Sequence, residues 1–211
     1  MKEYKLPIGC DVPETIILAD GDFPFHPLAL EWLRQCPYVV CCDGAANTYI
    51  RSGRMPEAIV GDGDSLLPDI KERYASLIHS EAEQETNDLS KAFRFCLSQE
   101  RRRITIMGAT GKREDHTIGN VSLLADYMEQ AEVSMMTDYG IFVPIREDSM
   151  FESYIGQQIS VFNMNSTALS AEGLAYPLSV FTNWWQGTLN EALARHFIIR
   201  TEGKVLVFRV F

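Results

Sequence analysis

The sequence lacks the features that would direct the chain to a membrane, a secretory route or nucleic acid. No stretch of its 211 residues reaches the ~18 consecutive apolar residues of a membrane-spanning helix, and the N-terminal residues hold no apolar signal-peptide core. Basic residues are few: 19 Lys and Arg stand against 29 Asp and Glu, giving a formal net charge of -10. An acidic chain repels phosphate backbones and anionic lipid. We therefore expect a cytoplasmic protein that binds neither nucleic acid nor a membrane.

The cysteine patterns of metal sites and disulfide frameworks are also missing. The five cysteines are an odd number and include no CxxC pair. Cys41 and Cys42 are adjacent within an apolar run, and on a strand they would point to opposite faces, which makes them poor ligands for one metal ion. We expect buried thiols in a reducing compartment.

The first two thirds of the chain alternate short apolar runs with helix-like segments. Strands are predicted at residues 15–19, 38–42, 58–60, 104–107 and 133–136, and helices at 27–35, 45–51, 87–98 and 116–128. Such alternation is typical of a parallel sheet with right-handed crossovers. We therefore predict an α/β fold with a doubly wound, mainly parallel sheet in residues 1–139.

The last third has a different pattern. Strand-like runs at 141–145, 159–162, 197–200 and 204–211 are punctuated by Gly, Asn, Ser and Pro. Only residues 189–195 suggest a helical turn. This pattern predicts a small antiparallel β-sandwich domain over residues 140–211.

Several predicted strands of the first domain end in an acidic residue. Asp20, Asp43, Asp62 and Asp138 each follow a strand, and Asp64 comes two residues after Asp62. Ligands of open parallel sheets bind beyond the carboxyl ends of the strands. Paired carboxylates there suit Mg²⁺, which prefers hard oxygen ligands and shares substrate phosphates. We predict a metal role for Asp62 and Asp64, and for Asp20 a role in a turn or a helix cap.

The segment from Gly108 to His116 follows a strand and opens a helix. Glycines let the backbone approach an anion, and a helix N-terminus attracts phosphate. Lys112 and Arg113 add positive charge. The segment is neither a Walker A loop nor a GxGxxG loop. The alternative is a helix start capped by Asp115, with both cations solvated and His116 as a structural hydrogen-bonding residue.

Residues 84–88 also precede a helix. Thr86 or Asn87 is a natural N-cap, and Asp88 is favourable in the first helical turn. Taken alone, this spacing indicates a helix start rather than a binding site.

The order of these motifs resembles the thiamine pyrophosphokinase family. The resemblance covers nearly the whole chain through DGAAN (Asp43–Asn47), GDGDS (Gly61–Ser65), QETNDLSKA (Gln84–Ala92), GATGKREDHTIGN (Gly108–Asn120), EGLAYPL (Glu172–Leu178) and GTLNE (Gly187–Glu191). It implies a homodimer that transfers a pyrophosphoryl group from ATP to the thiamine hydroxyl with Mg²⁺ and releases AMP.

The resemblance also implies roles for individual residues. Metal-binding and catalytic roles fall on Asp43, Asp62, Asp64 and Asp88. Contacts to ATP fall on Asn47, Thr110, Arg113, Asp115, His116 and Asn120. Contacts to thiamine fall on Gln84, Trp185, Thr188 and Asn190, and the alternative for the Trp184–Trp185 pair is packing within the β domain.

The chain departs from the family pattern at several positions. Ala45, Glu85 and Asn87 replace Gly, Asp and Thr, whereas Gly63 replaces a bulky residue and should loosen the loop between the two acids. Leu189 stands where the family usually has Ser, near the alcohol substrate. Two other functions stay open: a pyrophosphokinase acting on another small alcohol such as a pterin, and a non-catalytic nucleotide-binding module. The number of acids argues against the module, because carboxylates repel a polyphosphate unless a cation intervenes.

Overall fold

The structure is a computed structural model that describes residues 1–7, 11–81, 83 and 85–211. The chain forms two compact units, here named the α/β unit and the β unit. The α/β unit runs to Leu123 and takes in Gln130–Asp138. The β unit consists of the described N-terminal residues 1–7, Leu124–Glu129 and Tyr139–Phe211. Among the described residues, no helix has both the length and the apolar character needed to cross a membrane.

The α/β unit is built on a parallel sheet. Its strands are β2 (Thr15–Leu18), β3 (Val39–Cys42), β4 (Ala58–Gly61), β5 (Ile78–Ser80), β6 (Arg103–Met107) and β7 (Glu132–Met136). They lie in the order β7-β6-β2-β3-β4-β5, with every neighbouring pair parallel. Every residue of β2, β3 and β4 is buried, as expected for a sheet covered on both faces. The order of the strands reverses between β2 and β6, where open α/β sheets place their ligands.

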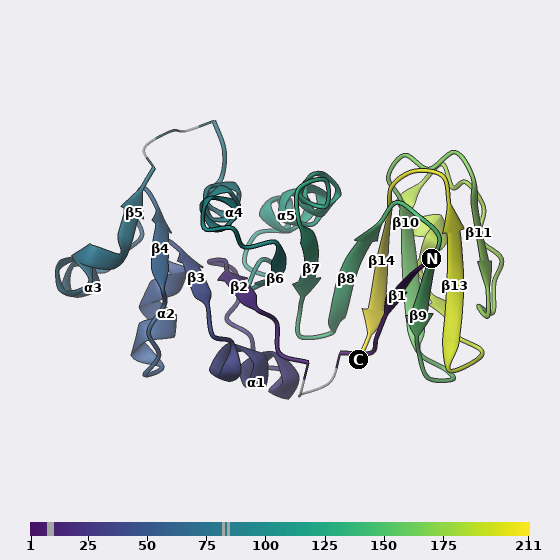
Figure 1. Cartoon of the computed structure of the whole chain (residues 1–211), viewed down its shortest axis with the longest axis horizontal. Coiled ribbons are helices and arrows are strands. Elements are labelled where there is room, and N and C mark those ends of the chain that lie inside the picture. The colour runs from purple at the N-terminus through teal and green to yellow at the C-terminus, as the bar shows by residue number, and fades with distance from the viewer. Residues whose placement is uncertain (8–10, 82, 84) are drawn as a thin grey trace. The chain divides into compact units, whose positions relative to one another are not determined.

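Helices on both faces make this sheet doubly wound, as predicted. They are α1 (Pro27–Gln35), α2 (Ala45–Arg51), α3 (Pro68–Arg73), α4 (Asp88–Ser98) and α5 (Glu114–Tyr127), with a short 3₁₀ turn, η1 (Ala75–Leu77). Figure 1 shows α1 and α2 on one side of the sheet and α4 and α5 on the other. The bounds of α1 and α2 are those predicted. The segment from α3 to β5 was not anticipated from the sequence.

The β unit contains two sheets. One has the order β1 (Lys2–Tyr4), β9 (Ser149–Glu152), β13 (His196–Thr201) and β11 (Leu169–Glu172), and the other β12 (Asn190–Glu191), β10 (Gln158–Asn163), β14 (Val205–Val210) and β8 (Gly140–Ile145). Buried residues of both sheets form one core, which includes Val143, Phe151, Val161 and Phe197. The pairs are antiparallel except β1 with β9, so a mainly antiparallel sandwich is present as predicted.

Two expectations about the β unit need correction. Strand β1 pairs with β9 and therefore belongs to the β unit, whereas the prediction assigned all of residues 1–139 to the first domain. The helical turn expected at 189–195 is wrong, because this segment forms β12 and a bridge from Ala192 to Leu174. Leu189 has a φ of 61°, and the Asn190 side chain bonds to the backbone of Tyr176, so the chain runs alongside that segment instead of coiling.

Candidate functional site

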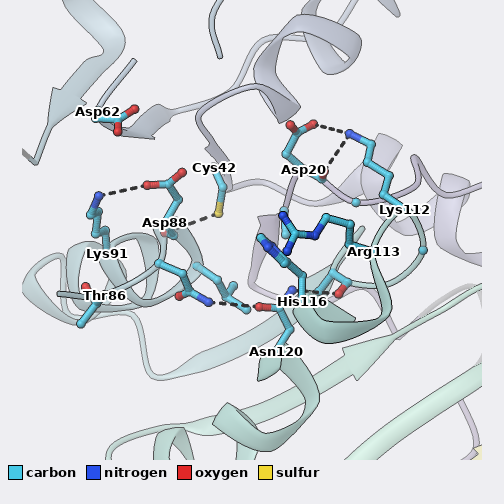
Figure 2. Close-up of a pocket in the computed structure, with 16 residues that line it drawn as sticks. Asp20, Cys42, Asp62, Thr86, Asp88, Lys91, Lys112, Arg113, His116 and Asn120 are labelled. Carbon is cyan, nitrogen blue, oxygen red and sulfur yellow. Dashed lines mark hydrogen bonds and ion pairs between the residues drawn. The ribbon is translucent and has the colours of Figure 1, made fainter. Parts of the chain in front are cut away.

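A cavity of about 440 Å³ lies at the carboxyl ends of the central strands of the α/β unit. Its walls come from the residues after β2, β4 and β6 and from the first turns of α4 and α5 (Figure 2). The lining side chains include Asp20, Cys42, Asp62, Thr86, Asn87, Asp88, Lys91, Lys112, Arg113, His116 and Asn120. The cavity thus occupies the point where the strand order reverses. It brings together residues from three of the four predicted motifs of the first domain, and no residue of Asp43–Asn47 is among those that line it.

The loops after β2 and β6, which both contribute residues to the cavity, are hydrogen-bonded to each other. The backbone N–H groups of Gly21 and Asp22 donate to the carbonyl oxygens of Gly108 and Thr110 at 2.6 and 2.9 Å. Lys112 Nζ donates to the Asp20 carbonyl oxygen at 2.8 Å and lies 3.1 Å from Asp20 Oδ1. The turn role expected for Asp20 is therefore incomplete, because its side chain lines the cavity and pairs with a cation (Figure 2).

Three carboxylates lie near one another beside the cavity. Asp62 and Asp88 line it, whereas Asp43 is not among the lining residues. Asp43 is only 4% exposed; its Oδ2 accepts from Ser65 N at 3.1 Å, while Oδ1 has no hydrogen-bond partner among the described residues. A Cβ atom on Gly61 would lie 2.8 Å from Asp43 Cβ and 3.4 Å from Asp88 Cγ, so both acids flank this glycine. Burial raises the pKa of Asp43, and the neighbouring charges of Asp88 and Asp62 raise it further.

These acids fit a divalent cation chemically. The unpartnered Oδ1 of Asp43 is a buried oxygen that a cation would satisfy, and carboxylate oxygens are the ligands that Mg²⁺ prefers. Within the described residues no three acidic, His or Cys side chains converge on one metal position. Mg²⁺ does not need such a cage, because it is usually held by one or two carboxylates together with water and substrate phosphates.

The loop that carries Asp62 and Asp64 is fastened from two sides. Asn47 Nδ2 donates to the Ser65 carbonyl at 2.8 Å, and its Oδ1 accepts from Leu67 N at 3.0 Å. Lys71 Nζ donates to the Gly63 carbonyl at 3.1 Å, which counters the loosening expected from this glycine. Asp62 lines the cavity, whereas Asp64 is exposed and does not, so its metal role stays a prediction. Asn47 is also absent from the lining.

The start of α5 supplies the second group of predicted residues. Arg113, His116 and Asn120 line the cavity, whereas Thr110 and Asp115 do not. Arg113 grips Asp115 with two bonds of 3.1 and 2.6 Å, and this contact raises the pKa of the guanidinium and lowers that of the carboxyl. Both side chains are largely exposed, so the pair is free to open when an anion binds.

The start of α4 is tied to α5 and to its own preceding loop. Asn87 caps α4 by accepting from Ser90 N at 2.9 Å, as predicted, and its Nδ2 donates to Asn120 Oδ1 at 3.2 Å. Arg94 donates to Thr86 Oγ1 at 3.1 Å and to Glu83 Oε1 at 2.8 Å. The hydrogen bond from Thr86, and then that from Arg94, lower the pKa of Glu83 to about 2. Gln84, predicted to contact thiamine, lies outside the described residues.

Lys91 is a site residue that the sequence analysis did not single out. Its side chain lines the cavity although it is only 3% exposed, and its Nζ lies 3.2 Å from Asp88 Oδ1 (Figure 2). The available signal was its place three residues after Asp88, which puts both side chains on one face of a helix.

The remaining predicted residues lie in the β unit. Trp185 is 72% exposed, whereas Asn190 is buried. Asn190 is bonded through both ends of its amide to the backbone of Tyr176, at 3.0 and 2.8 Å. Thr188 Oγ1 donates to the Trp185 carbonyl at 2.7 Å. Asn190 therefore shapes the backbone, and the contacts of all three residues with thiamine stay predictions.

Fold and cavity together define a class: an α/β protein with a cavity lined by carboxylates and cations at the switch point of its sheet, joined to a β-sandwich. Residues 29–136 match the family model described as thiamin pyrophosphokinase, catalytic domain, and residues 140–208 match its substrate-binding domain. The chain therefore belongs to the thiamine pyrophosphokinase family.

Individual relatives agree with this assignment. The chain is 30% identical over 129 residues to thiamine pyrophosphokinase 1 of Oryza sativa subsp. japonica, covering 49% of each chain. It is 31% identical over 162 residues to thiamine pyrophosphokinase 1 of Arabidopsis thaliana, covering 62% of this chain and 60% of the relative. The aligned part spans about half the length of the first such relatives, at 49%, 57% and 46%.

Solved structures share the fold. Thiamin pyrophosphokinase from Candida albicans superposes with a TM-score of 0.79 at 18% identity, covering 100% of this chain and 93% of that one. Thiamine pyrophosphokinase from Bacillus subtilis gives a TM-score of 0.78 at 21% identity, covering 93% and 98%.

Proposed function

We propose that this chain is a thiamine pyrophosphokinase, which transfers the pyrophosphoryl group of ATP to the hydroxyl of thiamine and releases AMP. Membership of the family supports the reaction. The single structural observation that carries it is the cavity at the sheet's switch point, where a group of carboxylates faces a group of cations. This arrangement suits a metal-bound polyphosphate, because a carboxylate cluster alone would repel it.

The two sides of the cavity have different tasks in this proposal. Asp43, Asp62 and Asp88 would hold Mg²⁺, which supplies charge neutralisation to the phosphates. Lys112 and Arg113 would bind phosphate oxygens, and the exposed Arg113 can turn from Asp115 toward the nucleotide. Little covalent work remains for the protein, so positioning and charge stabilisation would carry the acceleration.

Thiamine binding and dimerisation are assigned to the β unit. The family model for residues 140–208 carries the description substrate-binding domain, which supports this assignment. The exposed side chains of Tyr176, Trp184, Trp185 and Leu189 supply apolar and aromatic surface that a thiamine ring or a second subunit would cover. We propose a homodimer, and the cytoplasmic location stays a prediction.

The reaction is tested by incubating the purified chain with MgATP and thiamine. We expect thiamine pyrophosphate and AMP in equal amounts, measured by chromatography. A pterin alcohol offered in place of thiamine tests the alternative acceptor. AMP release with the pterin and not with thiamine would show a pyrophosphokinase that acts on another alcohol. ATP binding without AMP release, with either alcohol, would leave only the nucleotide-binding module.

The acids of the cavity are tested by Asp62→Asn. We expect turnover to fall by about a hundredfold or more with unchanged thermal unfolding, because the variant loses a metal ligand but keeps the loop. Asp64→Asn distinguishes the two predicted metal ligands. Because Asp64 is exposed and does not line the cavity, we expect this variant to lose less turnover than Asp62→Asn. Wild-type turnover in Asp62→Asn would remove the metal role from this residue.

A further inference from the structure

Lys91 places a positive charge inside the cavity wall. Its side chain is 3% exposed, while Lys112 and Arg113 on the opposite side are 54% and 69% exposed. Among the described residues, Asp88 Oδ1 at 3.2 Å is the one acceptor of its ammonium group. An ammonium has three donors, so a single partly exposed carboxylate leaves most of its hydrogen-bonding capacity unused.

This burial is unfavourable for the protein without ligands. A buried charge loses its hydration, and one ion pair rarely compensates for that loss. The other buried residues of α4 are Leu89, Ala92, Phe93 and Cys96, which are apolar or weakly polar, so Lys91 is the charged member of this buried set. An apolar side chain at position 91 would therefore stabilise the fold better, which indicates that the charge serves a ligand.

The acids around Lys91 explain its position. Asp88 pairs with it directly, and Asp88 and Asp43 both flank Gly61, the residue that precedes Asp62, so all three carboxylates share one small region. Without a metal ion, Lys91 is the nearly buried cation bonded to this group. Its positive charge partly neutralises these carboxylates, as a bound divalent cation would.

We propose that Lys91 is an internal counter-ion that Asp88 exchanges for a divalent cation, so that the ammonium becomes free for a phosphate oxygen only when the cation arrives. The inference rests on the proposed binding of a metal–polyphosphate and deepens it. Lys91 would then bind substrate phosphate while Asp88 turns to the metal, and the two binding events would favour each other by linkage.

The consequence can be measured without turnover. Replacing Lys91 by Met removes a positive charge that competes with the cation. We expect Lys91→Met to bind Mn²⁺ about tenfold more tightly than wild type in the absence of nucleotide. Mn²⁺ should also tighten binding of the α,β-methylene analogue of ATP less in the variant than in wild type. Free Mn²⁺ is measured by electron paramagnetic resonance, and binding of the analogue by calorimetry.

Lys204→Met is the matched control. Lys204 is also a partly buried lysine, 2.9 Å from Glu129 Oε1 in the β unit, so its loss changes the net charge equally. It should leave Mn²⁺ binding as in wild type. If both variants bound Mn²⁺ more tightly to the same extent, the change in net charge alone would explain the effect, and the inference would be overturned.

Unchanged or weaker Mn²⁺ binding by folded Lys91→Met, or no Mn²⁺ binding by wild type, would likewise overturn it. Where Lys91→Met does not fold, Lys91→Gln supplies the same comparison. The readout also separates the two proposals. Wild type that binds Mn²⁺ and the analogue but makes no thiamine pyrophosphate contradicts the proposed function alone. Full turnover by wild type with unaltered Mn²⁺ binding in Lys91→Met contradicts only the role of Lys91.

Discussion

Asp43 is a buried carboxylate, and its Oδ1 has no hydrogen-bond partner in the part of the chain that the structure describes. Its negative charge therefore destabilises the metal-free fold. Its pKa is raised by burial first, so the folded state holds the proton more tightly than the unfolded state does. Metal-free protein should therefore gain stability as the pH falls through this raised pKa. Residues at binding sites often trade stability for function in this way.

We expect Asp43→Asn to raise the free energy of unfolding of the metal-free protein by about 1 kcal/mol at neutral pH, while abolishing turnover. The gain should shrink toward about pH 4, where the wild-type carboxyl also becomes neutral. Urea unfolding in EDTA at a series of pH values measures both. The exposed Asp64→Asn serves as the control and should change little. A variant less stable than wild type at every pH would show that the Asp43 charge supports the fold.

At the level of single residues, the sequence identified the acids better than their partners. Asp43, Asp62 and Asp88 were predicted from strand ends and motif order, and the structure gathers them around Gly61. Lys91 was missed because a lysine inside an amphipathic helix is usually solvated, and only tertiary packing shows that this one is buried. The hydrogen bonds of Asn47 to the backbone of Ser65 and Leu67 could not be predicted either, because these partners lie about 20 residues away in the sequence.

At the level of elements, strongly patterned segments were predicted and mixed ones were not. Helix α1 begins with Pro27 at its first turn and a capping bond from Leu28 N to His26 Nδ1, and its bounds were predicted correctly. Helix α3 buries only Ile70, so the segment Pro68–Arg73 carries no apolar period to detect. Strand β12 has two residues and depends on its pairing with β10, which local sequence does not encode.

The loop between β4 and α3 gives an element-scale prediction, because its shape depends on the two backbone bonds of Asn47. We expect Asn47→Ala to lower the free energy of unfolding by about 1–3 kcal/mol, since the Ser65 carbonyl and the Leu67 N–H lose their partner. The Mg²⁺ concentration needed for half-maximal turnover should rise with it, because Asp62 lies on this loop.

Chemical denaturation and a Mg²⁺ titration at saturating ATP measure these two effects. Thr48→Ala, one position along on the exposed side of α2, is the matched control. If Asn47 contacts ATP directly, as the family resemblance implies, the KM for ATP rises while stability and Mg²⁺ dependence stay at wild-type values. That outcome would contradict the structural role.

At the scale of the molecule, both unit types could be predicted because strand–helix alternation and closely spaced short strands are distinct patterns. The placement of β1 could not be predicted, because its three residues pair in parallel with β9, a strand that is distant in the sequence. The exposed apolar side chains of the β unit are a property of the whole molecule as well. Six of them lie between residues 176 and 193, and exposed apolar side chains that gather in this way are typical of a binding surface.

A homodimer that covers this region makes Trp185 a candidate hot spot, since it is 72% exposed in the single chain. We expect Trp185→Ser to weaken the dimer by about tenfold or more in Kd, measured by sedimentation equilibrium. Phe25→Ser is the matched control, because Phe25 is 65% exposed but lies in the α/β unit. Thiamine binding should weaken together with dimerisation if both use this surface. A wild-type chain that is monomeric at high concentration, or a dimer weakened by Phe25→Ser and not by Trp185→Ser, would place the exposed tryptophan outside any subunit interface.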